Sequence, residues 1–134
     1  MRGLVATHGG IGAELVEVVA MIMGPGTGLE SLSNHGKSAH DLTEEIVVWL
    51  RGEGESGAGS QEPAIIFIDD YGGSCANAAQ LACRPSDPVA LVSGVNLAML
   101  LGFATWHEEL ELEELVQRLV ERGRTAITRL GGAS

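Results

Sequence analysis

Short apolar runs alternate along this chain with longer segments in which apolar residues recur at helical spacing. The runs at 3–7, 64–68 and 89–93 are each about five residues long, and the middle one is uninterrupted and rich in β-branched residues. Such runs are typical of strands buried on both faces. A weaker run at 29–33 predicts one more strand. Helical spacing predicts helices over 11–23, 38–50, 74–82, 96–105 and 108–124.

The order of these elements indicates an α/β fold. Strands and helices alternate, so we expect a four-stranded parallel sheet with helices on both faces. Because crossovers are right-handed, the chain winds one way to the second strand and returns past the first, which predicts the strand order 2-1-3-4. Ligands in such sheets bind at the carboxyl ends of the strands where the order reverses. His8 follows the first strand at this point, and Asp69 follows the third.

The length of 134 residues suits a single domain spanning 1–134. The polar, glycine-rich stretch at about 52–62 predicts a flexible surface loop within it. Weak alternation over 125–130 predicts a short edge strand at the C-terminus.

The amino-acid composition restricts the classes of molecule that we expect this chain to bind. Eight Lys and Arg residues against 18 Asp and Glu give a formal net charge of −10, which opposes binding to nucleic acid or to anionic membranes and favours a protein with a basic face. No run approaches the ~20 apolar residues that span a bilayer, and 1–7 is too short for a signal peptide, so we expect a cytoplasmic protein. Cys75 and Cys83 do not predict a disulfide framework and are interpreted as packing residues.

His8 is the first candidate for chemistry. It lies between a strand end and the turn Gly9–Gly10, which opens a helix. A lone histidine there is more often a cap, but a carboxylate on one ring nitrogen would fix the tautomer and leave the other nitrogen as a nucleophile. The amides of Gly9 and Gly10, at a helix N-terminus, would bind an anion such as a phosphoryl group.

Other motifs are incomplete. A dinucleotide fingerprint would need a third glycine where Leu15 stands, and a P-loop would need a lysine, but Lys37 is the only one. The pair Asp69–Asp70 follows the third strand, whereas a phosphorylated receiver domain has its acidic pair after the first. No metal is expected, because the remaining polar candidates do not form a convergent set of four ligands: Asn34, His35 and His40.

Four segments, taken together and in order, resemble the mannose-family enzyme IIA proteins of the bacterial phosphoenolpyruvate:sugar phosphotransferase system. The first is Val-Ala-Thr-His-Gly-Gly-Ile-Gly-Ala-Glu-Leu at 5–15, and the second is Phe-Ile-Asp-Asp-Tyr-Gly-Gly-Ser-Cys-Ala-Asn-Ala-Ala at 67–79. The others are at 93–100 and 120–124, so the resemblance covers nearly the whole chain.

This resemblance implies that His8 is phosphorylated on its outward ring nitrogen by the phosphohistidine of the carrier protein HPr, and that a IIB component accepts the group. It implies that Asp69 orients His8, and that Gly72, Gly73 and Ser74 line the phosphoryl pocket. No cofactor is implied, and contact with a membrane would be only indirect, through a permease complex. Family members are homodimers that exchange a C-terminal antiparallel edge strand, which 126–130 matches in place.

The chain departs from the family's usual residues in two places. Asp70 stands where a neutral residue is usual, and Cys75–Ala76 replaces a proline–aromatic pair. An alternative function therefore stays open: a regulatory phosphoprotein of an incomplete phosphotransferase system, which controls a target without sugar transport. A further alternative is a small-ligand binding domain in which His8 is idle.

Overall fold

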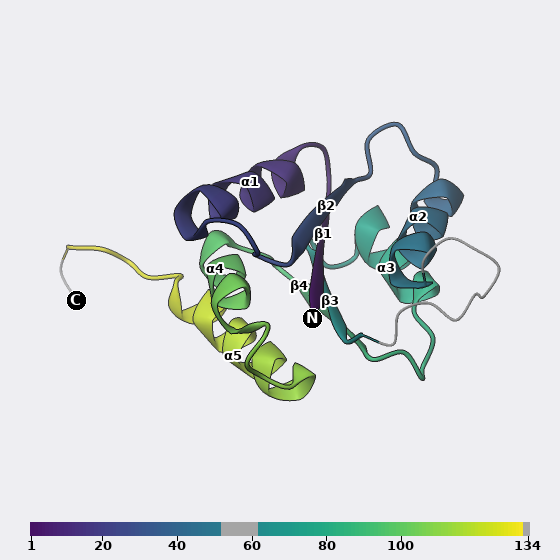
Figure 1. Cartoon of the computed structure of the whole chain (residues 1–134). Helices are drawn as coiled ribbons and strands as arrows, with labels where there is room; N and C mark the ends of the chain where they lie inside the picture. The colour runs from purple at the N-terminus through teal and green to yellow at the C-terminus, as the bar shows by residue number, and fades with distance from the viewer. Residues whose placement is uncertain (52–61, 133–134) are drawn as a thin grey trace.

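Four parallel strands form the centre of the molecule in the order β2-β1-β3-β4 (Figure 1), as the sequence predicted. The computed structural model describes residues 1–51 and 62–132. The expected loop at about 52–62 lies outside the described residues, apart from Glu62. The strands are β1 (Arg2–Thr7), β2 (Leu29–Ser33), β3 (Ala64–Ile68) and β4 (Val89–Ser93).

Within the described residues, five helices cover both faces of the sheet (Figure 1). They are α1 (Ile11–Met23), α2 (Ala39–Arg51), α3 (Ser74–Ala82), α4 (Leu97–Trp106) and α5 (Leu112–Thr125). Helices α2 and α3 pack on one face, and α1, α4 and α5 on the other. The α/β fold with helices on both faces is therefore confirmed.

One helix begins later than the sequence predicted. The expected helix over 108–124 starts at Leu112, and a turn precedes it in which the amides of Glu109 and Leu110 bond to the carbonyl of Trp106. This turn reverses the chain so that the apolar face of α5, with Leu115 and Leu119, packs on the core shared with α4. Helical periodicity alone does not show such a reversal.

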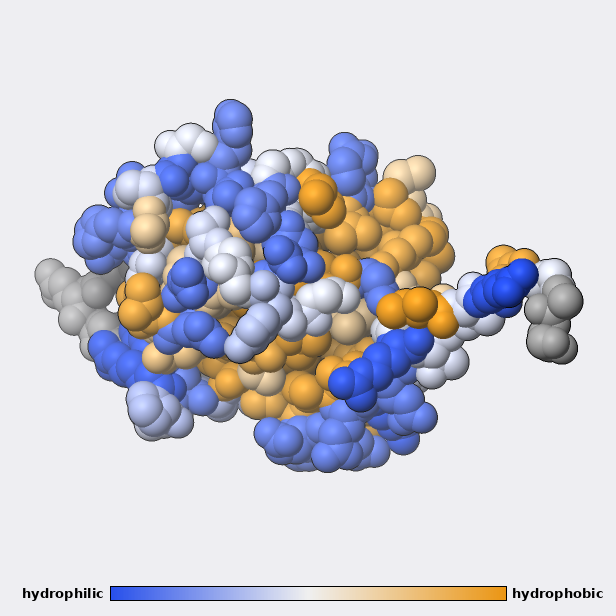
Figure 2. Space-filling view, turned by 180° about the vertical axis from the view of Figure 1, so that it is seen from behind, coloured by the Kyte–Doolittle hydropathy of each residue, from blue (hydrophilic) through white to orange (hydrophobic). Residues whose placement is uncertain are grey.

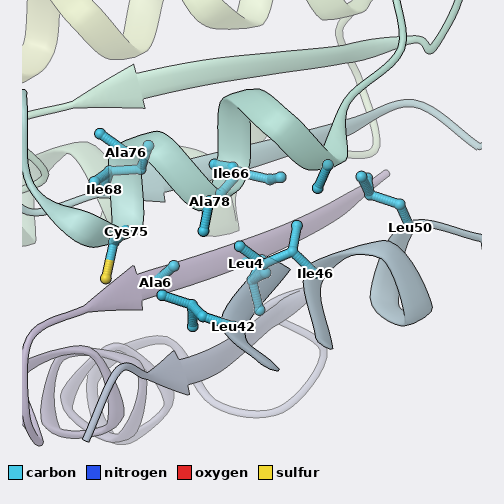
Figure 3. Close-up of a cluster of buried hydrophobic side chains, with 12 residues drawn as sticks. Leu4, Ala6, Leu42, Ile46, Leu50, Ile66, Ile68, Cys75, Ala76 and Ala78 are labelled. Carbon is cyan, nitrogen blue, oxygen red and sulfur yellow. The ribbon is translucent and has the colours of Figure 1, made fainter. Parts of the chain in front are cut away.

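The core has two layers because side chains of a strand alternate between the faces. Leu4 and Ala6 of β1 point into the layer under α2 and α3, whereas Val5 points into the layer under α4 and α5. Figure 3 shows the first layer, in which the side chains of α2 and α3 meet those of β1 and β3. The strands that carry the expected site are thus held by packing on both sides.

Parallel register places three strand ends together. Ala6 of β1 pairs with Ile68 of β3, and Thr7 pairs with Ser33 of β2. The residues that follow these strands therefore leave the sheet at one edge, side by side.

The C-terminal segment 126–132 forms no strand within the described chain. It projects from the body of the molecule (Figures 1 and 2), and the side chains of Ile127 and Leu130 are 81% and 90% exposed. A strand needs a hydrogen-bonding partner, and a single chain offers this segment none where it lies. Exchange of an edge strand between subunits stays a prediction. Among the described residues, the helices are too short or too polar to cross a lipid bilayer.

Candidate functional site

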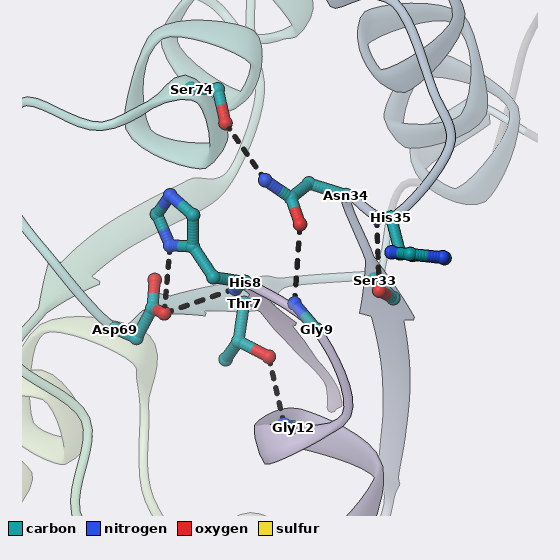
Figure 4. A network of polar contacts seen from close by, with 9 residues as sticks. All are labelled: Thr7, His8, Gly9, Gly12, Ser33, Asn34, His35, Asp69 and Ser74. Carbon is teal, nitrogen blue, oxygen red and sulfur yellow. Dashed lines mark hydrogen bonds and ion pairs between the residues drawn. The ribbon is translucent and has the colours of Figure 1, made fainter.

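The candidate site lies at the carboxyl ends of β1, β2 and β3, where the loops leave the sheet (Figure 4). His8 follows β1, Asn34 follows β2 and Asp69 follows β3. The sequence predicted that His8 and Asp69 would meet here, and the structure brings them together.

A single carboxylate oxygen holds His8 twice. Oδ2 of Asp69 lies 2.9 Å from the ring nitrogen Nδ1 of His8 and also accepts the backbone N–H of His8 at 3.0 Å. The side chain of His8 is 45% exposed and that of Asp69 is 16% exposed. In Figure 4 the other ring nitrogen, Nε2, points away from Asp69. With Nδ1 donating to the carboxylate, Nε2 keeps its lone pair, which is the form of imidazole that acts as a nucleophile.

The carboxyl group of Asp69 is ionised at neutral pH. Partial burial would by itself raise the pKa of its carboxyl group, but the hydrogen bonds from the backbone and the ring of His8 outweigh burial and lower the pKa below its usual range. The negative charge of Asp69 is therefore present at neutral pH, where it stabilises positive charge on the imidazole ring.

Asn34 joins the three loops, and sequence reasoning missed this role. Its Oδ1 accepts the backbone N–H of Gly9 at 3.2 Å, and its Nδ2 donates to Oγ of Ser74 at 3.2 Å. The position of Asn34 directly after the strand beside β1 was a usable signal. Because the amide of Gly9 is bonded to Asn34, that amide would have to leave Asn34 to bind a phosphoryl group.

Two glycines are required by the backbone at this edge. Gly9 has a φ of +57° and Gly72 a φ of +92°, in the left-handed region that favours glycine. Gly73 lies close to His8, since a Cβ there would lie 3.0 Å from Cε1 and 3.4 Å from Nε2 of His8, and the ring would have to shift by a few tenths of an ångström. Its bare backbone lets the imidazole ring lie against the start of α3.

The first turn of α1 is anchored to β1 by a side chain. Oγ1 of Thr7, which is buried, accepts the backbone N–H of Gly12 at 2.8 Å. Gly10 precedes the helix as its N-cap, and its surroundings are open enough that an added Cβ would meet nothing within 4 Å. The predicted anion-binding end of α1 is therefore accessible beside His8.

The other acidic and histidine candidates take no part in the hydrogen bonds between His8 and Asp69. Asp70 is exposed, and the ring of His35 points away from His8 (Figure 4). His40 is exposed on α2, near Glu44. His107 is buried at the opposite end of the sheet, where its ring nitrogens lie 3.2 Å from the carbonyls of Met1 and Gly26.

Fold and site together define a doubly wound α/β domain with an exposed, carboxylate-oriented histidine at the strand-order reversal. The family model for the fructose IIA component of the phosphotransferase system, EIIA-man, matches residues 3–120. The chain therefore belongs to this mannose- and fructose-type enzyme IIA family, whose members act in phosphoryl transfer.

Solved structures agree on the fold. The mannose/sorbose-specific IIA subunit from Enterococcus faecalis is 20% identical and superposes with a TM-score of 0.82 over 99% of this chain and 96% of that one. The component EIIA from Streptococcus agalactiae is 17% identical, with a TM-score of 0.80 over 96% and 95%. A sigma-54 interaction domain protein from Enterococcus faecalis is 10% identical, with a TM-score of 0.71 over 95% and 93%. Comparison with curated proteins finds no match.

Proposed function

We propose that this protein is a phosphoryl carrier that accepts a phosphoryl group on Nε2 of His8 from the phosphohistidine of HPr. It then passes the group to a IIB component for sugar uptake and phosphorylation. The observation that carries the proposal is the 2.9 Å contact between Nδ1 of His8 and Oδ2 of Asp69, which directs the other ring nitrogen outward.

The transfer balances without a cofactor. The lone pair of Nε2 forms the new N–P bond while the N–P bond in the donor breaks and its electron pair returns to the donor's ring nitrogen. As the bond forms, positive charge develops on the ring of His8, and the Asp69 carboxylate stabilises it through the Nδ1–H hydrogen bond. When the acceptor takes the phosphoryl group, the N–P bond to His8 breaks, its electron pair returns to Nε2, and the positive charge on the ring is lost.

Groups around Nε2 suit a phosphoryl group. The N-terminus of α1 supplies backbone amides and a partial positive charge beside His8. Oγ of Ser74 already accepts a hydrogen bond from Asn34, which leaves its own proton for donation to a phosphoryl oxygen. Gly72 and Gly73 let the backbone approach this position closely.

Labelling with phosphoenolpyruvate, enzyme I and HPr tests the assignment. Intact-mass analysis should show one added phosphoryl group, which is stable in alkali and labile in acid, and His8→Ala should not acquire it. His35→Ala is the matched control, because it removes an exposed histidine near the site whose ring points away from His8. Equal labelling of His8→Ala would overturn the proposal.

We also propose a homodimer joined by exchange of the C-terminal segment. Strand β4 ends the sheet order, so its outer edge has no strand partner among the described residues. The segment with Ile127 and Leu130 stands exposed, and Figure 2 shows hydrophobic side chains over the neighbouring part of the surface as well. Swapping an identical element is a low-cost route to a dimer.

Deleting residues 126–134 removes the segment after the end of α5. Light scattering should give twice the chain mass for the full protein and a single chain mass for the truncated one. A truncated protein that remains a stable dimer would show that the segment is not the connection.

A regulatory role is the second candidate. It is favoured by the likeness in fold to the sigma-54 interaction domain protein and by the departures at Asp70, Cys75 and Ala76. In that case His8 would still be labelled by HPr, but mannose-family IIB components would accept no phosphoryl group from it. Transfer to such a component decides in favour of the sugar relay.

A further inference from the structure

Three side chains of kinds that bind metals in other proteins lie close together at the candidate site. The residues are His8, Asp69 and Cys75, and each offers one ligand atom such that all three atoms lie within 4.8 Å of one another. They come from the ends of β1 and β3 and from the first turn of α3. Among the residues that the structure describes, no other group of three such side chains comes together.

Cys75 is the unusual member of this cluster. Its side chain is fully buried, and Figure 3 shows its sulfur pointing from the start of α3 toward β1. Burial raises the pKa of the thiol, and the charge of Asp69 raises it further. The sulfur is thus neutral and unreactive by itself, and a cation that displaced its proton would gain a thiolate ligand.

Asp69 carries an acceptor atom without a partner. Oδ2 holds His8, but Oδ1 is buried and has no hydrogen-bond partner among the described residues. Leaving a charged, buried oxygen unpaired is costly. This independent observation indicates that something positive or proton-bearing belongs between Asp69 and its neighbours.

We propose that His8, Asp69 and Cys75 form a binding site for a thiophilic divalent cation, Zn²⁺, with three protein ligands and an open fourth position. Zinc takes sulfur, imidazole nitrogen and carboxylate oxygen at about 2.0 to 2.3 Å, which separates tetrahedral ligands by about 3.3 to 3.7 Å. The three atoms lie within 4.8 Å of one another, so their separations need to change by up to about 1.5 Å, which side-chain rotations provide.

The donor set selects the class of metal. Thiolate and imidazole suit zinc and other borderline or soft cations, whereas Mg²⁺ and Ca²⁺ prefer sets of oxygen ligands. The three negative or neutral donors also match the charge of the ion, because thiolate and carboxylate together balance two positive charges. Magnesium present in a phosphotransfer assay should therefore not compete for this site.

Metal binding and phosphorylation should exclude each other, a consequence that rests on the proposed function. Zinc on Nδ1 of His8 moves the ring proton to Nε2, which then has no lone pair for the phosphoryl group. Binding also releases the thiol proton of Cys75 to solvent. Conversely, a phosphoryl group on Nε2 keeps the proton on Nδ1, in the bond to Asp69, and closes the metal site.

The binding test uses Co²⁺ as a spectroscopic substitute and Zn²⁺ as the competitor. Co²⁺ should produce a thiolate-to-cobalt charge-transfer band in the wild type, and Zn²⁺ should abolish it. Cys75→Ala should lose the band and weaken zinc binding by more than the ~10- to 100-fold cost of losing an outer-shell partner. Cys83→Ala is the matched control, since it removes the other free thiol and should keep the band.

Circular dichroism of each variant establishes that it is folded, and Cys75→Ser, which keeps the size of the side chain, serves as a second variant. A wild type without the band, or a band that persists in Cys75→Ala, would overturn the site. The phosphorylation test measures the labelling rate with zinc divided by the rate without zinc. This ratio should fall strongly for the wild type and stay near one for Cys75→Ala. A protein that binds zinc at Cys75 but is never labelled would refute the phosphoryl carrier and leave the metal site intact.

Discussion

Replacing Asp69 with asparagine removes one negative charge from beside His8 with almost no change in size. In the wild type the carboxylate accepts both the ring Nδ1–H and the backbone N–H of His8. The asparagine amide can still accept one of these bonds. However, it can also turn its NH₂ group toward Nδ1, which favours the tautomer that carries the proton on Nε2 and cannot attack a phosphoryl group.

The size of the effect follows from the 2.9 Å between Nδ1 of His8 and Oδ2 of Asp69. At this distance, two unit charges interact by about 1.4 kcal/mol in water and by about 6 kcal/mol at an effective dielectric constant of 20. His8 is 45% exposed and Asp69 only 16%, so an intermediate value applies. A loss of about 2 to 3 kcal/mol corresponds to a transfer rate about 30- to 160-fold lower.

Rapid-quench labelling from phospho-HPr measures this rate, with intact mass as the readout. The matched control is Asp70→Asn, which removes a neighbouring exposed carboxylate. The reasoning fails if Asp69→Asn transfers as fast as the wild type, or if Asp70→Asn slows transfer as much as Asp69→Asn.

Three further predictions follow from the same geometry. Gly73→Ala should slow labelling about tenfold, because its Cβ would lie 3.0 Å from Cε1 of His8 and displace the ring by a few tenths of an ångström. Gly10→Ala, whose Cβ meets nothing within 4 Å, should label as the wild type does, and equal slowing of both would contradict the steric argument. Asp70→Thr should shift the equilibrium distribution of the phosphoryl group between this protein and HPr toward this protein by up to about fivefold. The reason is that it removes about 1 kcal/mol of repulsion between two charges ~4 Å apart in water. An unchanged distribution would show that Asp70 does not face the phosphoryl group. Because the pKa of Asp69 lies below its ordinary value near 3.8 in the folded protein, its carboxylate stabilises the fold above that value and stops doing so as the pH falls through the lowered pKa. The free energy of unfolding of the wild type should therefore exceed that of Asp69→Asn at neutral pH, and the difference should shrink as denaturation is measured at progressively lower pH below about 4; a difference independent of pH would contradict this.

The fold followed from local patterns to a large extent. Several elements have the predicted bounds. They are the strands Leu29–Ser33, Ala64–Ile68 and Val89–Ser93 and the helices Ile11–Met23 and Ser74–Ala82. These segments owe their structure to apolar periodicity and to glycine or proline at their ends, which are local properties of the chain.

The main pair of the site was predictable for a similar reason. His8 and Asp69 stand directly after strands, and a right-handed parallel topology leaves few ways to arrange those strands. Their meeting depends on strand order alone, not on the path of a long loop. The 2.9 Å contact between them is the detail that only the structure supplies.

Only the tertiary structure decided the rest. Asn34 connects Gly9 to Ser74, and the sulfur of Cys75 lies within 4.8 Å of a ring nitrogen of His8. Both contacts exist because the loop after β2 and the first turn of α3 follow particular paths that no periodicity encodes. The start of α5 was likewise decided by packing, since its apolar face had to return to the core beside α4.

Sequence by itself therefore determined the layers of this protein, the order of its strands and the histidine–aspartate pair at their ends, because these depend on local periodicity and a few topological rules. Tertiary structure decided which other side chains reach that pair, because such contacts join residues far apart in the chain. The segment at 126–130 illustrates the difference between what the sequence and what the tertiary structure determined. Its pattern suits a strand, but a strand exists only where another strand pairs with it, and the folded single chain leaves this segment exposed.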